Sequence, residues 1–264
     1  EFKGANQGAW LNRLEAEHEN LRAGLDWSLG LGPEGAEKAL RFCGALMRYW
    51  ELRGYLSEGR EWCARALNAP GGQEPNMTRV RALTTSCALA FRLNDYTAAQ
   101  SYAQESLLIS REVGDRGGIA DSLGDLGALA ITLGDSVSAR TYMEESLAIF
   151  REMGNPDRMA RVLNHLGSVA FHQKDYVSAH TFYTESLALR REMGDTGGVA
   201  MALVNLGTSA QQKGDYTSAR VFYEESLTIY RELGSRTFIA STANYLGNVA
   251  RRQGDYMSAR ALYK

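Results

Sequence analysis

Three histidines lie close together in the sequence and are the first residues to consider for chemistry, because imidazole is a common metal ligand. His165 and His172 are two helical turns apart in one expected helix, and His180 falls in the next. A zinc site needs three or four ligands, and no cysteine or carboxylate shares the spacing of these histidines. We therefore interpret them as scattered surface residues and expect no metal site.

Cysteine is the second residue type that could carry chemistry. Cys43, Cys63 and Cys87 are an odd number in a chain of this length, which argues against a disulfide framework. All three fall at expected helix-packing positions, so we interpret them as buried structural thiols. Cys43 and Cys63 are expected to be neighbours within one helix pair, and a bond between them stays open.

The motifs of common enzymes are missing from the sequence. No glycine-rich loop is followed by Lys-Ser or Lys-Thr, and no serine, histidine and aspartate occur on a nucleophile turn. Adjacent acids such as Glu144 and Glu145 point to different faces of a helix, as on a solvated surface. We expect no catalytic residue and no cofactor.

Composition favours a folded chain without a global electrostatic preference. The 264 residues are 44% hydrophobic and carry a formal net charge of −2, which gives no field toward nucleic acid or membranes. No apolar run is long enough for a membrane span, and the first residues, EFKGANQGAW, lack the features of a signal peptide. We expect a cytoplasmic location. The missing initiator Met and the ending YMSARALYK suggest a fragment of a longer polypeptide.

A repeat of 40 residues positions all of these side chains. Shifting the sequence by that length aligns an aspartate, an alanine and a glycine in successive copies. We assign repeats to residues 40–79, 80–119, 120–159, 160–199 and 200–239, with a truncated sixth at 240–264. The aligned aspartates are Asp95, Asp135, Asp175, Asp215 and Asp255.

Each repeat contains two stretches with helical periodicity, bounded by glycine and a short polar residue. In the third repeat, Gly134 ends the first stretch and Asp135 can cap the second; Gly154 and Asn155 follow in the same way. The sequence therefore predicts an all-α protein of antiparallel helix pairs, with roughly 18 residues in each helix.

One stripe of each helix is small or apolar. Within a repeat, positions 4, 7, 8 and 11 form the stripe of the first helix and positions 17, 20, 24, 27 and 28 that of the second. Gly at position 8 and Ala at position 20 would let the two backbones approach closely while aromatic rings fill the remaining space. Examples are Leu163, Leu166, Gly167 and Ala170 on one helix and Tyr216, Ala219, Tyr223, Ser226 and Leu227 on another.

This pattern resembles the tetratricopeptide repeat (TPR) from residue 40 to the end, although the period is 40 rather than 34. The resemblance implies a right-handed superhelical solenoid with a concave groove. Residues 11–29 and 39–67 resemble the segment that joins the ATPase core to the repeat arm in bacterial signal-transduction ATPases and transcription regulators. We therefore expect a helical cap or linker at 1–39 and a solenoid at 40–264.

Positions 2, 5, 9, 12 and 13 of the first helix lie opposite the packing stripe, and we call them the first-helix face. In a TPR-like superhelix this face lines the groove. Over six repeats it holds seven arginines (Arg41, Arg48, Arg81, Arg92, Arg161, Arg251 and Arg252) against two acids (Glu51 and Asp121). The predicted partner-binding residues are Arg81, Arg161, Asn164, Ser168, Phe171, Thr208, Gln211, Asn244, Asn248 and Arg251.

Guanidinium and amide groups pair with carboxylates and with the backbone of extended peptides. The first-helix face therefore predicts binding of a protein or extended peptide, and its arginines favour an acidic one. The alternative is a polar face that only keeps the array soluble. The function is then either that of the sensor arm of a larger bacterial regulator or that of a self-standing adaptor. Direct nucleic-acid binding is disfavoured, because stacking aromatics are not interleaved with the arginines. Self-association through the last repeat is a further expectation.

Overall fold

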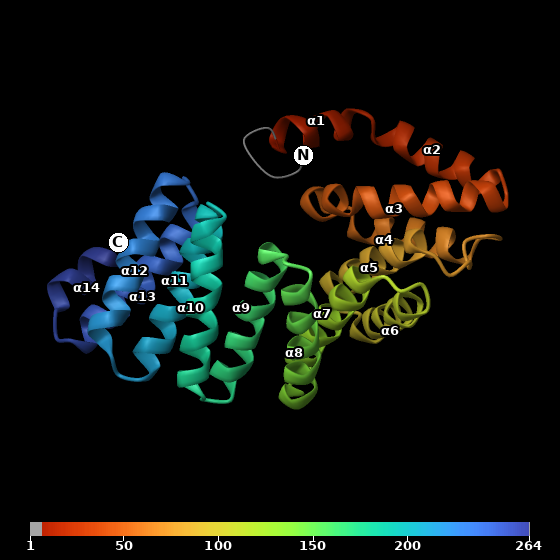
Figure 1. Cartoon of the computed structure of the whole chain (residues 1–264). Coiled ribbons are helices and arrows are strands. Elements are labelled where there is room, and N and C mark those ends of the chain that lie inside the picture. Colours follow the sequence, from red (N-terminus) through yellow and green to blue (C-terminus); the bar gives the residue numbers. More distant parts are fainter. Residues whose placement is uncertain (1–6, 264) are drawn as a thin grey trace. The chain divides into compact units, whose positions relative to one another are not determined.

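The computed structural model describes the backbone of residues 7–263 and the side chains of residues 9–263. Within these residues it contains fourteen helices and no strand (Figure 1). The predicted all-α array of antiparallel helix pairs is confirmed. The chain divides into an N-terminal unit, Glu1–Asp135, and a C-terminal unit, Ser136–Lys264.

The helices of the N-terminal unit follow one another as neighbours. α3 packs on α4 and α5, and α5 packs on α4, α6 and α7, so contacts stay close in sequence. This is the arrangement of a stacked repeat. The helices are α1 (Gln7–Ala16), α2 (His18–Gly30), α3 (Pro33–Arg53), α4 (Leu56–Asn68), α5 (Met77–Arg92), α6 (Tyr96–Glu112) and α7 (Arg116–Thr132).

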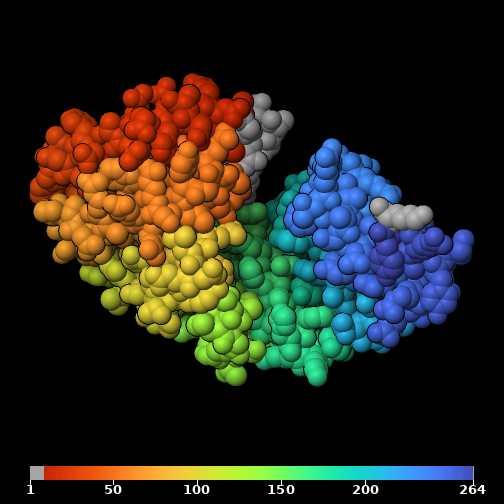
Figure 2. Space-filling view, turned by 180° about the vertical axis from the view of Figure 1, so that it is seen from behind, coloured from red at the N-terminus to blue at the C-terminus, as the bar shows by residue number. Residues whose placement is uncertain are grey.

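The C-terminal unit is more regular, and all but its last helix contain 17 residues. Neighbouring colours also lie side by side within this unit in the space-filling view (Figure 2). The helices are α8 (Ser136–Glu152), α9 (Pro156–His172), α10 (Tyr176–Glu192), α11 (Thr196–Gln212), α12 (Tyr216–Glu232), α13 (Arg236–Arg252) and α14 (Tyr256–Leu262).

The predicted punctuation sets the ends of these helices. The Asp215 side chain accepts a hydrogen bond from the Ser218 backbone N–H at 3.0 Å, and Asn155 does the same for Arg158 at 3.1 Å. Bonds from Ser218 lower the pKa of Asp215. The preceding Gly214 has φ 81°, the left-handed conformation that ends α11.

The predicted packing stripe is buried in the C-terminal unit. Leu163, Leu166 and Ala170 are buried, and only Tyr216 among the named stripe residues of the second helices is half-buried. A Cβ on Gly167 would lie 2.4 Å from Cε1 of Tyr183. Glycine is therefore required because a tyrosine ring from the partner helix lies against the backbone.

A boundary at residue 39 would cut α3. Gly32, with φ 71°, is followed by Pro33 at the first turn of that helix, and proline is favoured there because its fixed φ suits a helix start. The first repeating helix therefore begins earlier than the sequence pattern alone predicted. The division between cap and solenoid stays a prediction.

The three cysteines are buried, as predicted, and all three are free thiols. Cys43 on α3 and Cys63 on α4 lie within hydrogen-bonding distance, and this contact together with burial raises the pKa of the Cys43 thiol. A raised pKa keeps a thiol protonated and unreactive. Cys43 and Cys63 therefore act as small core side chains between α3 and α4.

Candidate functional site

The first-helix face of the C-terminal unit begins on α9. Arg161 is exposed at its start, and Asn164, Ser168 and Phe171 are each half-buried further along. The Asn164 side-chain oxygen accepts a hydrogen bond from the Asn205 side chain of α11 at 2.7 Å. Asn164 therefore links neighbouring first helices and has one acceptor site engaged within the protein.

In each of the last three repeats, the side chain at position 9 of the first helix forms a hydrogen bond with a tyrosine of the second helix. The Tyr223 hydroxyl lies 3.0 Å from Thr208 Oγ1 and 3.3 Å from Gln211 Oε1. The Tyr263 hydroxyl donates to Asn248 at 2.9 Å, and Ser168 bonds the Tyr183 hydroxyl. The residues predicted as groove contacts at this position therefore also fix the aromatic rings of the helix pair.

Phe171 packs inside its own repeat. Its ring meets that of Tyr176 edge to face, with centroids 5.5 Å apart, and it lies against the core cluster that contains Ala170 and Tyr183. Such a pair contributes about 0.5–1.5 kcal/mol beyond simple burial. Only part of the Phe171 ring is left for contact with a partner.

His165 corrects the interpretation of the histidines as surface residues. Burial, aided by the charges of Arg161 and Arg190, lowers the pKa of His165 to about 4, so the imidazole is neutral at pH 7. His172 and His180 are exposed as expected. The periodicity missed His165 because position 6 lies between the packing stripe and the first-helix face and becomes covered only when repeats stack.

The last repeat carries Asn244, Asn248 and Arg251. Asn244 is exposed and lines a cavity of about 430 Å³ together with Ile239, Ala243 and Tyr263. Arg251 is exposed and, among the residues that the structure describes, forms no ion pair. The face is thus polar and open at this end.

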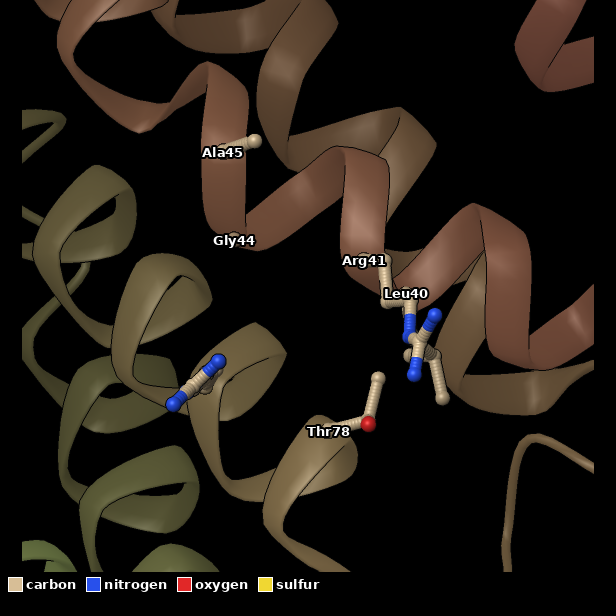
Figure 3. A pocket seen from close by; sticks show the side chains of 6 residues that line it. Leu40, Arg41, Gly44, Ala45 and Thr78 are labelled. Atoms are coloured by element: carbon tan, nitrogen blue, oxygen red, sulfur yellow. The ribbon is translucent and has the colours of Figure 1, made fainter.

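In the N-terminal unit, Arg81 lies at a pocket between α3 and α5. The pocket has a volume of about 330 Å³ and is lined by Leu40, Arg41, Gly44, Ala45, Thr78 and Arg81. Figure 3 shows the side chains of Arg41 and Thr78 pointing toward one another across it. Sequence reasoning counted Arg41 among the arginines of the face but did not single it out, and it missed Thr78. The sequence feature that could have indicated this pocket is the pair of small residues Gly44-Ala45.

Part of the positive charge of the face is neutralised internally. Glu51 forms ion pairs with Arg48, at 2.8 Å, and with Arg92. In the described residues, no ion pair involves Arg81, Arg251 or Arg252. Arg48 and Arg92 are therefore less available to a partner than Arg81, Arg251 and Arg252.

Arginines on the second helices have a structural role. Arg151 bonds Glu185 and Arg191 bonds Glu225, each at 2.6 Å, between successive repeats of the C-terminal unit. These two arginines therefore connect neighbouring repeats through the second helices. Exposed pairs of this kind contribute at most about 1 kcal/mol each.

The described residues contain no group of three or more His, Cys, Asp or Glu side chains arranged to hold a metal ion. None of the helices formed by these residues is both long and apolar enough to cross a membrane.

The fold and this face define a helical-repeat protein of the class that serves as a scaffold for protein or peptide partners. A family model described as tetratricopeptide repeat matches residues 78–152, 138–192 and 158–232, more than half of the chain. The chain belongs to the tetratricopeptide repeat family. That family match indicates no catalytic family, and no curated protein matches the chain.

Solved structures with the same fold are distant in sequence. BtubC (BKLC) from P. vanneervenii is 22% identical, with a TM-score of 0.68 over 79% of this chain and 85% of that one. A signal transduction ATPase with numerous domains (STAND) protein with a tetratricopeptide repeat sensor, from Pyrococcus horikoshii, is 15% identical, with a TM-score of 0.70 over 88% of this chain and 40% of that one. The apo form of the quorum sensor NprR from B. thuringiensis is 15% identical, with a TM-score of 0.63 over 84% and 62%. At these identities the similarity concerns the fold.

Proposed function

We propose that the chain binds an acidic, extended segment of a partner protein along the first-helix face, and that it serves as the partner-binding or sensor arm of a larger bacterial regulator. The observation that carries the binding proposal is the set of exposed arginines on this face, among which Arg81 and Arg251 have no ion pair within the described residues. Solvated guanidinium groups without an internal partner are suited to carboxylates.

The regulator context is supported by two of the similar structures. One is a STAND protein with a tetratricopeptide repeat sensor, and the other is a quorum sensor. This chain spans 40% of the STAND protein, so an arm attached to further domains agrees with that likeness. A self-standing adaptor is the alternative, and the sequence upstream of Glu1 separates the two: a nucleotide-binding core there supports the arm.

A defined acidic peptide tests the binding proposal. We expect a fluorescein-labelled peptide of six glutamates to bind the chain more tightly than a matched peptide of six glutamines, as measured by fluorescence anisotropy. The variant with Arg161→Glu, Asn164→Ala, Asn244→Ala and Arg251→Glu is expected to bind the acidic peptide more weakly. Equal affinity of the wild-type chain for both peptides would contradict the proposal, provided that circular dichroism shows the fold intact.

Self-association through the last repeat stays a separate prediction. Phe238 on α13 and Met257 on α14 are exposed there, at 53% and 81%, and exposed apolar side chains favour association. Light scattering after size-exclusion chromatography at several concentrations would reveal a dimer. A constant monomer mass across that range would rule it out.

A further inference from the structure

His18 lies where the N-terminal helices meet the first repeating helix pair. It is the first residue of α2, which packs along α3 and also contacts α4 (Figure 1). Its side chain is only 15% exposed. Its ring is stacked on the ring of Tyr55, in the turn between α3 and α4, with centroids 4.3 Å apart. A titratable ring is therefore held in one orientation where three helices meet.

Both ring nitrogens of His18 have a partner. Nδ1 lies 2.8 Å from the hydroxyl oxygen of Tyr49 on α3, and Nε2 lies 3.3 Å from a carboxylate oxygen of Glu58 on α4. An ionised carboxylate only accepts hydrogen bonds, so Nε2 must carry a proton in order to bond Glu58. Whether Nδ1 also carries a proton depends on the direction in which the Tyr49 hydroxyl donates its single proton.

The Tyr49 hydroxyl has a second partner that fixes this direction. It donates to Glu15 on α1 at 3.2 Å, and the Tyr55 hydroxyl donates to the other oxygen of Glu15 at 2.7 Å. Burial raises the pKa of Tyr49, so its hydroxyl keeps the proton. The hydrogen bond from Tyr55 lowers the pKa of Glu15, so that carboxylate is ionised and accepts from both tyrosines. Because Tyr49 gives its proton to Glu15, it can only accept from His18.

All of these hydrogen bonds form together only when both nitrogens of His18 carry a proton. A neutral imidazole has one donor nitrogen and one acceptor nitrogen. If its proton is on Nε2, Nδ1 can only accept from Tyr49, and Glu15 then loses the Tyr49 proton. If its proton is on Nδ1, the bond to Glu58 is lost. The doubly protonated ring keeps every bond and places its positive charge near the two carboxylates.

Two arginines share these carboxylates with the histidine. Arg22 Nε lies 3.6 Å from Glu58, and Arg53 Nε lies 3.6 Å from Glu15. The arginine side chains are 50% and 29% exposed, so solvent screens them more than it screens His18. Arg22 faces the other oxygen of Glu58 from the one that His18 contacts. The histidine therefore keeps its own place in the network.

We propose that His18, Glu15, Tyr49, Tyr55 and Glu58 form a proton-operated latch, in which protonated His18 docks α1 and α2 on the α3–α4 pair and deprotonation loosens α1. The charge of an imidazole changes near neutral pH, so docking is tight at mildly acidic pH and weakens as the pH rises. This regulation goes beyond the proposed function and does not depend on it.

α1 is the helix that the latch controls. It reaches the rest of the N-terminal unit through Glu15 and through Leu11 and Leu14, which are partly buried against the core. Neutral His18 removes a hydrogen bond either from Glu15 or from Glu58. Hydrogen bonds to charged groups contribute more than neutral ones, so this loss changes how often α1 detaches.

Amide hydrogen exchange of α1 tests the latch, because it reports on this helix separately from the histidines of the C-terminal unit. Exchange is followed by mass spectrometry at about pH 5.5 and about pH 8, on either side of imidazole titration. Each rate is divided by that of the unfolded peptide, which removes the intrinsic effect of pH. We expect the protection of α1 to fall about tenfold as the pH rises. Constant protection would overturn the latch.

Three variants separate the latch from other titrating groups. In His18→Gln the residue cannot become charged, so the protection of α1 should no longer depend on pH. In Tyr49→Phe the ring still fills its buried site, but Nδ1 loses its partner, and the fall should be smaller than in the wild-type chain. His172→Gln, at an exposed residue of α9, is the control and should keep the full fall. A full fall in His18→Gln or in Tyr49→Phe would overturn the latch.

A spectroscopic readout on the wild-type chain covers the case in which a variant does not fold. With ¹⁵N-labelled histidine, nuclear magnetic resonance distinguishes a ring nitrogen that carries a proton from one that does not. At about pH 6 we expect two protonated nitrogens in His18 and one in His165, whose pKa is lowered to about 4 by burial. A single protonated nitrogen in His18 at this pH would overturn the latch.

Discussion

The helix pairs α3–α4 and α11–α12 are each closed by one large ring against one glycine, but the ring comes from the first helix in one pair and from the second helix in the other, at different positions of the repeat. In α11–α12 the first helix supplies Gly207 and the second supplies Tyr223, whose ring lies against the glycine. In α3–α4 the first helix supplies the large residue, Trp50, and the second helix supplies Gly59. A Cβ on Gly59 would lie 2.5 Å from the Trp50 ring.

The difference shows that a ring and a glycine can close a helix pair without occupying the same positions in every repeat. One large aromatic ring and one glycine are needed, and either helix can contribute the ring. Trp50 and Tyr223 are both fully buried, so each solution closes its interface. The first repeat therefore departs from the common residue pattern and still packs its two helices closely.

The largest expected effect is that of Trp50→Ala. Removing this ring leaves a cavity between α3 and α4, and the free energy of unfolding should fall by about 3–5 kcal/mol. Because the Cβ of residue 59 points into that cavity, Gly59→Leu should recover part of the loss in the Trp50→Ala background while destabilising the wild-type protein. Urea unfolding monitored by circular dichroism measures all four proteins. Additive effects of the two substitutions would contradict the contact between Trp50 and Gly59.

The second effect is a pH dependence of the C-terminal unit. The folded protein lowers the pKa of His165 from its ordinary value near 6.5 to about 4, mainly by burial. Between these two pKa values the unfolded chain binds a proton at His165 that the folded chain does not bind. The contribution of neutral His165 to the free energy of unfolding is therefore fully present above about pH 6.5 and is lost as the pH decreases toward 4. The full loss amounts to roughly 3 kcal/mol.

His165→Gln isolates this contribution, because glutamine does not titrate. Urea unfolding at pH 7 and pH 4.5 should show a smaller loss of stability in the variant than in the wild-type protein. His172→Gln, at an exposed histidine of the same helix, is the control and should leave the pH dependence unchanged. An identical loss in His165→Gln and wild type would show that His165 is not protected from protonation.

The third effect concerns the glycine of the regular pairs. A Cβ on Gly207 would lie 2.7 Å from Cε1 of Tyr223, so Gly207→Ala forces the ring to move and should cost about 1–3 kcal/mol. Gly197→Ala on the same helix is the matched control. The nearest atom to its added Cβ is 3.9 Å away, so the better helix propensity of alanine should raise stability by about 0.5–1 kcal/mol. Equal effects at the two glycines would refute the packing role assigned to Gly207.

The sequence predicted the regular repeats well because their caps and glycines act locally. Asp215 and Gly214 can be recognised within a few residues of the helix ends that they define. It predicted His165 and the pocket at Arg41 poorly, because both depend on which side chains of neighbouring repeats meet. Gly44 and Ala45 reveal an open space only when α3 and α5 are placed side by side. The same limit applies to Thr208 and Asn248, whose bonds to tyrosines join two helices.

The smallest effect tests a helix end at which two repeats differ. Gly214 ends α11 with φ 81°, but the corresponding residue after α9 is Lys174, with φ 62°. A side chain in this conformation costs about 1–2 kcal/mol. Replacement by glycine removes this strain, but the greater conformational freedom of glycine in the unfolded chain offsets part of the gain. Lys174→Gly should therefore raise the free energy of unfolding by roughly 0.5–1 kcal/mol, and Gly214→Ala should lower it by about 1 kcal/mol. Asn94, at φ 60°, tolerates the conformation better than lysine does, so Asn94→Gly should change stability less than Lys174→Gly. If thermal unfolding shows the same gain at both positions, the strain assigned to Lys174 is absent.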